Sequence, residues 1–459
     1  MLRVTVLERG RIKRSDADAG SVELGTPSCR TLPRWLYDRL RRSEGMREDR
    51  GEGAVFQWRR SHCLVGQWVG VMQIPGLQLE ILPKTDDNAL QDTDQEVRDI
   101  RRNLTEMLRR SGLGAVRMRG VADVALVRGN IHDHLVNAFL ARTLFELQRG
   151  LDRGYATEEG NLSTLRGKLV LSRHVVVNAA QKARFYCRHD VLTEATRISV
   201  RLKQACRVLV ARVLPALVMV KCQQVLALLD DVPDLPFRHR ESDPVFTRQN
   251  ERFADVYRFA CILLEGQAPD ALGGEVETFS LLFDMERVFE RYVAAFLASE
   301  VMHRLADVRL FPQARGYSFG LYRDRQGDVL RMTPDLLFLH EVQGVRRAFI
   351  IDTKWKRLSS EKGSRPSRSD LYQLYAYVHR YECRLAFLLY PRVAGVAPRD
   401  LQALTRQAGD HLGTVGVRFV DLNRKLWTRE GKAALADELE AIVREGLNLT
   451  EAAPVEASA

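Results

Sequence analysis

The chain has 459 residues, a formal net charge of +11 and a hydrophobic content of 45%. Charged residues make up 28%, and the counts of glycine (31) and proline (15) are ordinary, which excludes a disordered or collagen-like protein. At roughly 100–200 residues per domain, this length predicts two to four domains, each with its own hydrophobic core.

No segment has the pattern of a membrane span or a signal peptide. The most apolar run, Val208 to Val220, is too short to cross a bilayer and contains Arg212. Seven scattered cysteines without a CxxC pair indicate reduced thiols and a cytoplasmic protein. The excess of Lys and Arg (70) over Asp and Glu (59) fits a polyanionic partner, although many basic proteins bind no nucleic acid.

The first part of the chain, residues 1–125, is predicted to be a β-rich module. Short apolar stretches between residues 55 and 84 are typical of strands, and a Pro75–Gly76 turn precedes LQLEILPK. Apolar and polar residues alternate in LQLEILPK, as in a half-buried strand. A helical pattern, EVRDIRRNLTEMLRRSG, follows and ends at Gly112.

Residues 126–275 are predicted to form a mostly helical connector domain. IHDHLVNAFLARTLFELQRG is an amphipathic helix that Gly150 ends. VRLKQACRVLVARVLPALVMV is a second long helix, interrupted at Pro215. LRGKLVLSRHVV lies between them and is basic and partly alternating, and this part of the chain carries no obvious chemistry.

Residues 276–450 predict a mixed α/β sheet with helices on its faces, followed by a frayed tail at residues 451–459. The opening segment SLLFDMERVFERYVAAFLA has one apolar stripe and is predicted to be a helix. The expected strands are VRLFPQ, YSFGLY, TPDLLFLH and RAFIIDTKW, of which the last two flank a Gln343–Gly344 turn. A helix, DLYQLYAYVHRY, and a fully apolar strand, CRLAFLLYP, complete the pattern.

Two carboxylates and a lysine occupy one end of the predicted hairpin. Asp335 begins one strand and Asp352 ends the other, so that pairing brings them side by side. Burying both is costly unless a cation neutralises them, and Mg²⁺ accepts two carboxylates with retained waters. Lys354 points to the same face as Asp352, where it can orient or deprotonate a water and stabilise a phosphorane-like transition state. The set indicates metal-dependent phosphodiester hydrolysis, although D-x-K after an apolar strand is also common without such a site.

The helix that begins at Asp370 adds two polar side chains, Gln373 and Tyr377. They are four residues apart and therefore share a helical face, from which they can reach the lysine, metal-bound waters or a phosphate. The preceding loop is either solvated or makes salt-sensitive phosphate contacts. Its basic residues are Lys356, Arg357, Lys362, Arg365 and Arg368.

Pro-Asp, then Asp-x-Lys, then a helix with Gln-x-x-x-Tyr resembles the PD-(D/E)XK nucleases, notably their RecB-like branch. IIDTKWK followed by DLYQLYAYV resembles more closely the McrC family, the nuclease subunits of the McrBC modification-dependent restriction system. The resemblance extends through LFDMERVFERYV, LRGKLVLSRHV and GLQLEILPKT, and so touches most of the chain. It implies a restriction-endonuclease-like fold for the last third.

The resemblance also implies roles for individual residues. Asp335 and Asp352 would be metal ligands and Lys354 the catalytic lysine, with accessory roles for the two residues of the Gln-x-x-x-Tyr helix. Glu290 matches the Phe-Glu pair of the family and would add a carboxylate. Glu286 competes for that role, and a solvated glutamate is the alternative for either.

By the same resemblance the chain would be a Mg²⁺-dependent DNA endonuclease, with Mn²⁺ as the other metal considered. Its partner would be an McrB-type AAA+ GTPase hexamer that it stimulates and on which the first two domains dock. Its substrate would be double-stranded DNA with methylcytosine. The sequence has no GxxxxGK[ST] motif, so we expect no nucleotide bound by a P-loop in this chain.

Two other hypotheses stay open. A stand-alone PD-(D/E)XK nuclease would act without a GTPase. A non-cutting adaptor would activate a motor or clamp DNA, but the presence of Asp335, Asp352 and Lys354 together speaks against it. His132-x-His134 and Cys187-x-His189 resemble metal-ligand pairs, yet neither has a second pair at zinc-site spacing, so we expect ordinary residues there.

Overall fold

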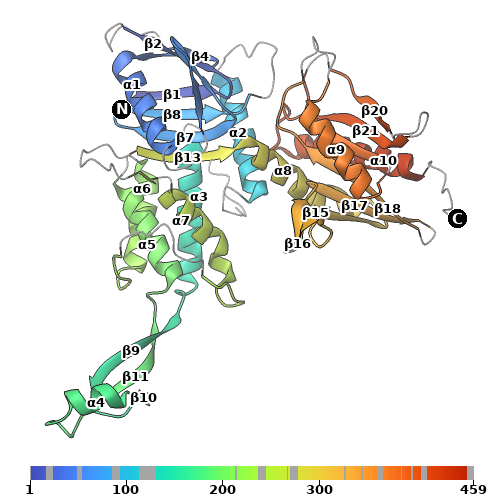
Figure 1. The fold of residues 1–459 in the computed structure, drawn as a ribbon. Helices are drawn as coiled ribbons and strands as arrows, with labels where there is room; N and C mark the ends of the chain where they lie inside the picture. Colours follow the sequence, from blue (N-terminus) through green and yellow to red (C-terminus); the bar gives the residue numbers. More distant parts are fainter. Residues whose placement is uncertain are drawn as a thin grey trace. The chain divides into compact units, whose positions relative to one another are not determined.

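The chain forms two compact units in a computed structural model (Figure 1). Unit 1 combines residues 1–117, 123–132 and 268–459, and unit 2 combines residues 118–122 and 133–267. The domain boundaries predicted after residues 125, 275 and 450 stay predictions. The structure describes residues 2–16, 24–48, 54–84, 94–112, 131–211, 214–235, 244–265, 267–268, 278–324, 327–342, 345–358, 365–383, 385–393, 396–404 and 411–451.

Two five-stranded sheets form the amino-terminal module of unit 1, with the strand orders β1-β8-β7-β13-β12 and β3-β4-β2-β6-β5. The predicted Pro75–Gly76 turn is confirmed, because β7 and β8 pair antiparallel on either side of it. The elements are β1 (Leu2–Leu7), β2 (Arg11–Ser15), β3 (Gly25–Thr26), β4 (Cys29–Pro33), α1 (Arg34–Glu48), β5 (Phe56–Trp58), β6 (His62–Val65), β7 (Trp68–Ile74), β8 (Leu77–Leu82), α2 (Asp94–Ser111), β12 (Gln267–Ala268) and β13 (Thr278–Asp284).

Strand β8 is buried on both faces, so the prediction of a half-buried strand is wrong. β1 pairs with it in parallel on one edge and β7 antiparallel on the other. Its polar residues are buried as well, and Glu80 is only 3% exposed. Arg101 of α2 donates two hydrogen bonds to the Glu80 carboxylate, at 2.8 and 2.7 Å. Because this ion pair offsets the cost of burying the charge, a polar residue can lie beneath α2.

The segment predicted as the opening helix of the last third begins as a strand. β13 pairs antiparallel with β7 and thereby belongs to the amino-terminal module. Helix α8 starts only at Met285, where the Asp284 carboxylate accepts a hydrogen bond from the Glu286 N–H at 3.0 Å and caps the helix. The apolar stripe did not separate the two elements, because Leu281 and Phe283 also fit the alternation of a strand.

The carboxy-terminal part of unit 1 contains a six-stranded mixed sheet with the order β14-β17-β18-β19-β21-β20. β17 and β18 form the predicted antiparallel hairpin, whereas β18, β19 and β21 run parallel. The expected mixed α/β character is confirmed, while the last two strands and the final helix had not been predicted. The elements are α8 (Met285–Phe296), β14 (Val308–Pro312), β15 (Phe319–Asp324), β16 (Gly327–Met332), β17 (Leu336–Val342), β18 (Val345–Thr353), α9 (Arg368–Arg380), β19 (Leu385–Pro391), β20 (Arg399–Leu404), β21 (His411–Val420) and α10 (Arg429–Glu451).

Helices α9 and α10 cover opposite faces of this sheet (Figure 1). On one face Leu374 of α9 packs in a core with Ile350 and Leu388. On the other face Gly446 of α10 lies so close to Phe349 that an added methyl group would come within 2.7 Å of the ring. Ile350 and Phe349 are neighbours on β18 and therefore point to opposite faces. The strand is thus buried on both sides, which explains its continuous apolar sequence.

Unit 2 combines helices with a β arm. The prediction of a mostly helical region is correct for its helices, including the break at Pro215, but wrong for residues 154–193. These form a three-stranded sheet, β10-β11-β9, with a short helix. A hydrogen bond between Thr157 and Asp190 (2.7 Å) and an ion pair between Arg188 and Glu159 (2.6 Å) join the two long strands. The elements are α3 (Ile131–Gln148), β9 (Gly154–Leu162), β10 (Lys168–Leu169), α4 (Leu171–Val177), β11 (Phe185–Thr193), α5 (Arg197–Val210), α6 (Ala216–Leu228) and α7 (Ala254–Glu265).

The predicted tail spans residues 451–459; Glu451 is the last residue of α10, and residues 452–459 lie outside the described residues. Among the described helices, none combines the length and the apolar character that crossing a membrane requires. The seven cysteines are all free thiols.

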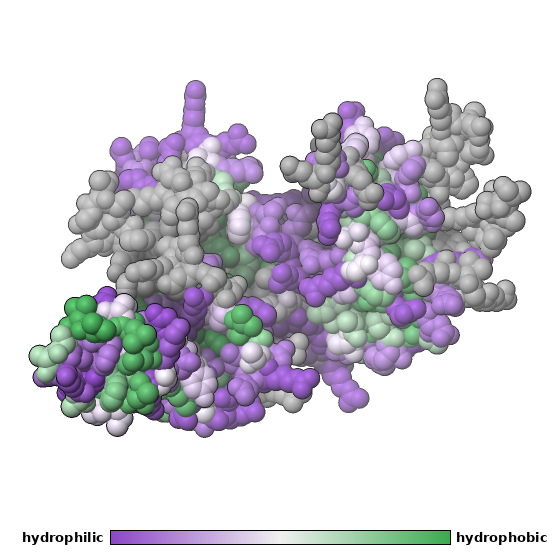
Figure 2. Space-filling view, turned by 60° about the horizontal axis from the view of Figure 1, so that its bottom comes forward, coloured by the Kyte–Doolittle hydropathy of each residue, from purple (hydrophilic) through white to green (hydrophobic). Residues whose placement is uncertain are grey.

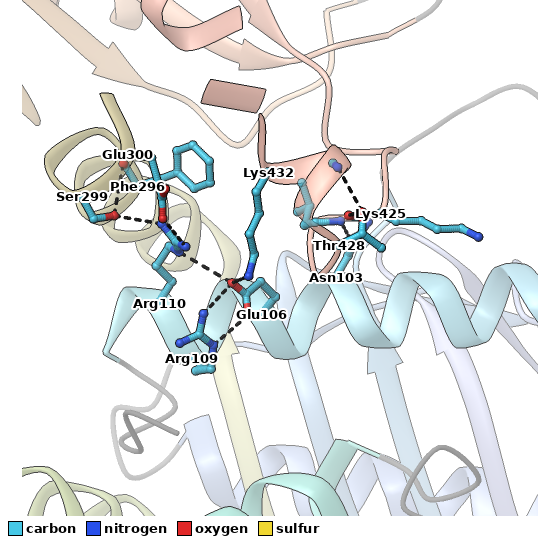
Figure 3. Close-up of polar contacts among 12 residues, drawn as sticks. Asn103, Glu106, Arg109, Arg110, Phe296, Ser299, Glu300, Lys425, Thr428 and Lys432 are labelled. Atoms are coloured by element: carbon cyan, nitrogen blue, oxygen red, sulfur yellow. Dashed lines mark hydrogen bonds and ion pairs between the residues drawn. The ribbon is translucent and has the colours of Figure 1, made fainter. Parts of the chain in front are cut away.

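Helix α2 connects the amino-terminal module to the carboxy-terminal part of unit 1 through a buried asparagine (Figure 3). The Asn103 side chain donates hydrogen bonds to the main-chain oxygens of Leu422 and Arg424, each at 3.0 Å. It accepts a third from the N–H of Leu426 at 2.8 Å. One side chain therefore satisfies three main-chain groups that have no partner in a helix or strand ladder.

Charged residues one and two turns further along α2 extend this contact (Figure 3). The Glu106 carboxylate accepts hydrogen bonds from Arg109 at 2.6 and 2.7 Å and lies 3.3 Å from the ammonium of Lys432. Arg110 pairs with Glu300 at 2.8 Å. Asn103 and the pairs with Lys432 and Glu300 therefore join α2 to the carboxy-terminal part, and both parts belong to one compact unit.

We expect Asn103→Ala to lower the free energy of unfolding of unit 1 by about 3 kcal/mol, because buried main-chain groups left without a partner cost ~1–3 kcal/mol each. Urea denaturation measures this difference. Thr105→Ala on the same helix is the matched control, since its hydroxyl donates only to the Arg101 oxygen within α2 at 2.8 Å. Equal losses in both variants would contradict the bridging role of Asn103.

Candidate active site

Asp335 and Asp352 lie opposite each other at one end of the β17–β18 hairpin. The register pairs Leu336 with Ile351, so the next position of the ladder places the two aspartates together. Thr353 donates hydrogen bonds to Oδ2 of Asp335 from its main-chain N–H, at 2.7 Å, and from its hydroxyl, at 2.6 Å. These bonds hold the Asp335 carboxylate against β18, and Asp352 is only 1% exposed.

Lys354 connects the carboxylates to helix α9. Its Nζ atom lies 2.7 Å from Oδ2 of Asp352 and donates a hydrogen bond to Oε1 of Gln373 at 3.1 Å. The Gln373 amide in turn donates to the Tyr377 hydroxyl at 2.8 Å. The structure therefore brings together five of the six residues expected at this site, and fixes the ammonium group between a carboxylate and an amide.

Burial and neighbouring charges change the ionisation of these groups. Burial, together with the nearby charges of Asp352 and Glu290, raises the pKa of Asp335 to about 8. Burial also raises the pKa of Asp352, although Lys354 opposes it. For Lys354 the carboxylates outweigh burial, and its pKa is raised. The lysine is therefore an ammonium at neutral pH, suited to stabilising negative charge and orienting a water rather than taking its proton.

Glu290 is the sixth expected residue, and the structure favours it over Glu286. Its charge raises the pKa of both Asp335 and Asp352. Glu286 lies in the first turn of α8, where its main-chain N–H is capped by Asp284. The glutamate whose charge acts on both aspartates therefore lies in the second turn of this helix.

Gln313 is a member of the site that the sequence did not reveal. Its side chain donates a hydrogen bond to the Glu290 carboxylate at 2.9 Å, and its N–H donates to the main-chain oxygen of Asp335 at 2.6 Å. Its φ of 52° and that of Ala314, 42°, lie in the left-handed region, which costs energy for residues with a Cβ. Strained backbone of this kind is often found at functional sites, but no sequence pattern around residue 313 predicts it.

Asp370, at the start of α9, is a second residue without an assigned role in the sequence. Its carboxylate pairs with Lys356 at 2.9 Å and accepts a hydrogen bond from the Tyr390 hydroxyl at 3.4 Å. Although burial opposes ionisation, Lys356 and Ser367 lower the pKa of Asp370. Its negative charge is one of the influences that raise the pKa of Asp352. Lys356 therefore neutralises a carboxylate in this structure, while Lys362 of the same basic loop lies outside the described residues.

The donor set fits a hard divalent cation. Two buried carboxylates with raised pKa values gain most from an ion that neutralises both, and oxygen atoms are the ligands that Mg²⁺ prefers. Within the described residues, no group of three or more His, Cys, Asp or Glu side chains is placed to hold a metal ion. An ion at Asp335 and Asp352 would therefore keep several waters, as Mg²⁺ commonly does. Among the described residues, His132, His134, Cys187 and His189 likewise belong to no such group.

Comparisons with known proteins give a family and a fold. The model of a family described as "McrBC 5-methylcytosine restriction system component" matches residues 64–391. A chain in a half-complex from the tetradecameric assembly of Thermococcus gammatolerans McrB AAA+ hexamers with bound McrC is 16% identical, with a TM-score of 0.61. The match covers 96% of this chain and 100% of that one. A chain of the Thermococcus gammatolerans McrBC complex is 19% identical, with a TM-score of 0.45 over 65% of this chain and 88% of that one. No curated protein matches the chain.

In the metal-free protein, we expect Asp335 to make stability fall as the pH rises. Its pKa of about 8 lies above the ordinary value of 3.8, so between these values the folded state holds a proton that the unfolded state releases. Urea denaturation in EDTA, from about pH 6 to about pH 8.5, should therefore show a steeper loss of stability for the wild type than for Asp335→Asn. Identical slopes would contradict the shift.

Proposed function

We propose that this chain, which belongs to the family of McrBC 5-methylcytosine restriction system components, is the DNA-cleaving subunit of such a system. The reaction would be metal-dependent hydrolysis of a phosphodiester bond by a PD-(D/E)XK-type site. One observation carries the proposal: Lys354 lies 2.7 Å from Asp352 and is hydrogen-bonded to Gln373, at the hairpin end where Asp335 meets Asp352.

Each of these side chains has a separate role in the proposed hydrolysis. Asp335 and Asp352 would hold Mg²⁺, which would supply Lewis-acid stabilisation of the phosphate and lower the pKa of a water. The Lys354 ammonium stabilises the charge that develops on the phosphoryl oxygens and orients the attacking water. Gln373 keeps the ammonium in place, and Tyr377 keeps Gln373 in place, because each link is a direct hydrogen bond.

A partner supplies the motor. The chain of similar fold from Thermococcus gammatolerans occurs with McrB AAA+ hexamers, and the present sequence has no P-loop motif of its own. We therefore assign to this chain an McrB-type AAA+ GTPase hexamer as partner, whose hydrolysis it stimulates. Double-stranded DNA with methylcytosine is the substrate, and recognition of the modified base falls to the partner.

The β arm of unit 2 has the surface of a protein contact. It exposes large apolar side chains, among them Tyr155 (78% exposed), Leu171 (67%) and Val176 (76%). Figure 2 shows green atoms gathered at its lower left, over the arm. Clustered exposed apolar surface is unfavourable in water and commonly marks an interaction site. We assign this surface to the AAA+ partner, in line with the docking role expected for the middle region.

We expect Asp352→Asn to reduce DNA cleavage at least about 1,000-fold while stimulation of the partner GTPase stays unchanged, because the side chain lies in the proposed metal site.

Gln373→Ala should reduce kcat about tenfold, since the Lys354 ammonium loses one of its two side-chain partners. The measurement is cleavage of methylated and unmethylated plasmid with Mg²⁺, with and without the partner and GTP.

The same assay separates the alternatives. Cutting that requires the partner, GTP and methylation supports the proposal. Cutting by the chain alone would identify a free-standing nuclease. Stimulation of the GTPase without any cutting would identify an adaptor.

We expect Val176→Asp to reduce stimulation of the partner GTPase at least about tenfold without changing thermal stability, because a charge on an apolar contact must be desolvated on binding. Val220→Asp is the matched control, since Val220 is also exposed (50%) in unit 2 but lies on α6 outside the arm. Equal GTPase stimulation by both variants would show that the arm does not contact the partner.

A further inference from the structure

A hydrogen bond between two buried side chains joins the amino-terminal module to the residue after Lys354. The Trp355 indole N–H donates to Oε2 of Glu8 at 2.8 Å. Trp355 is 5% exposed and Glu8 is 2% exposed. Glu8 directly follows strand β1, so this bond connects the edge of one sheet to the end of another.

Trp355 is the middle of three consecutive residues that are each held by a different element. The N–H of Lys354 donates to the main-chain oxygen of Leu389 on β19 at 2.9 Å. The ring of Trp355 packs against that of Phe289 on α8, with centroids 5.4 Å apart. Lys356 pairs with Asp370 on α9. Phe289 directly precedes Glu290, so the indole of the residue after Lys354 packs against the helix that carries this glutamate.

Burying the Glu8 carboxylate costs free energy. Burial raises the pKa of Glu8, against the Trp355 hydrogen bond and the charge of Arg9. Its Oε1 atom accepts no hydrogen bond from the described residues and lies 3.9 Å from Nε of Arg9. A cavity of about 10 Å³, room for one water, adjoins it and is also lined by Lys84 and Arg357.

An apolar side chain would fill this space without the cost of desolvating a charge. A hydrogen-bond acceptor, unlike an apolar side chain, also fixes the orientation of the Trp355 ring, because it bonds the indole N–H. The clamp made by Asn103 and Glu106 on α2 holds the module at a second place, so the position of Glu8 relative to β18 is defined by more than this bond.

We propose that Glu8 is a positioning residue for the nuclease site: by fixing Trp355 it fixes Lys354, so that the amino-terminal module sets the geometry of catalysis. This inference rests on the proposed nuclease function. It makes the module part of the active enzyme and not only a surface for a partner. Glu8 itself touches none of the reacting groups and acts through the indole.

The kinetic test uses the full chain with its AAA+ partner, GTP, Mg²⁺ and methylated DNA. Glu8→Ala and Trp355→Phe should each lower kcat about tenfold with KM for DNA unchanged, since a misplaced lysine affects the transition state more than binding. The double variant should be no slower than either single variant, because both remove the same bond. Glu8→Gln keeps an acceptor and should retain activity within about threefold.

Glu80→Gln is the matched control, because Glu80 is also a buried glutamate of this module but pairs with Arg101 inside it. It should lower thermal stability and leave kcat of the folded protein unchanged. Unchanged kcat in Glu8→Ala, or losses that multiply in the double variant, would overturn the positioning role.

Hydrogen exchange decides the same question without any cleavage. In Glu8→Ala, the amide of Lys354, which is bonded to Leu389, should exchange about tenfold faster than in the wild type, and in Glu80→Gln it should not. Unaltered exchange at Lys354 would overturn the proposal. A wild-type complex that cuts no DNA would instead count against the nuclease function, and the exchange result would still stand.

Discussion

The placement of two like-charged carboxylates at the buried open end of the β17–β18 hairpin is the constraint on which the site depends. Asp335 and Asp352 cannot both ionise cheaply there, which is why the pKa of Asp335 rises to about 8. Neighbouring groups stabilise the two carboxylates: Thr353 donates two hydrogen bonds to Asp335, and the Lys354 ammonium pairs with Asp352. A cation that neutralises both charges would relieve the remaining repulsion, so the energetic cost and the proposed chemistry have the same origin.

Each of these neighbours is in turn held by a more distant part of the chain. Lys354 is fixed from α9 by Gln373 and from β19 by its main chain, while the residue after it is bonded to Glu8 in the first sheet. α8 begins directly after β13, a strand of the amino-terminal sheet, and carries Glu290. The residues at the hairpin end are therefore held by contacts from both parts of unit 1, which form one compact body.

What could be predicted from the sequence is what local periodicity determines. The spacing of the hairpin placed Asp335 opposite Asp352, and the helical repeat placed Gln373 and Tyr377 on one face, because both depend only on near neighbours. Gln313 was missed because its position depends on a left-handed turn without glycine. Glu8 was missed because its partner is 347 residues away, a pairing that no pattern in a single sequence encodes. β13 was missed because its residues satisfy the strand and the helix repeat equally well.

Two features of this chain are unfavourable in isolation, and they are of opposite kinds. The hairpin end buries negative charge, and the arm exposes apolar side chains such as Tyr155 and Val176. Neither serves the stability of the chain, since neutral residues at the first place and polar residues at the second would cost less. Under the proposed function, binding would relieve both: a cation would neutralise the carboxylates, and a protein surface would cover the apolar side chains. Departures from the stability optimum are expected at functional sites, and two such places are what the proposed function, a nuclease subunit that acts within a complex, requires.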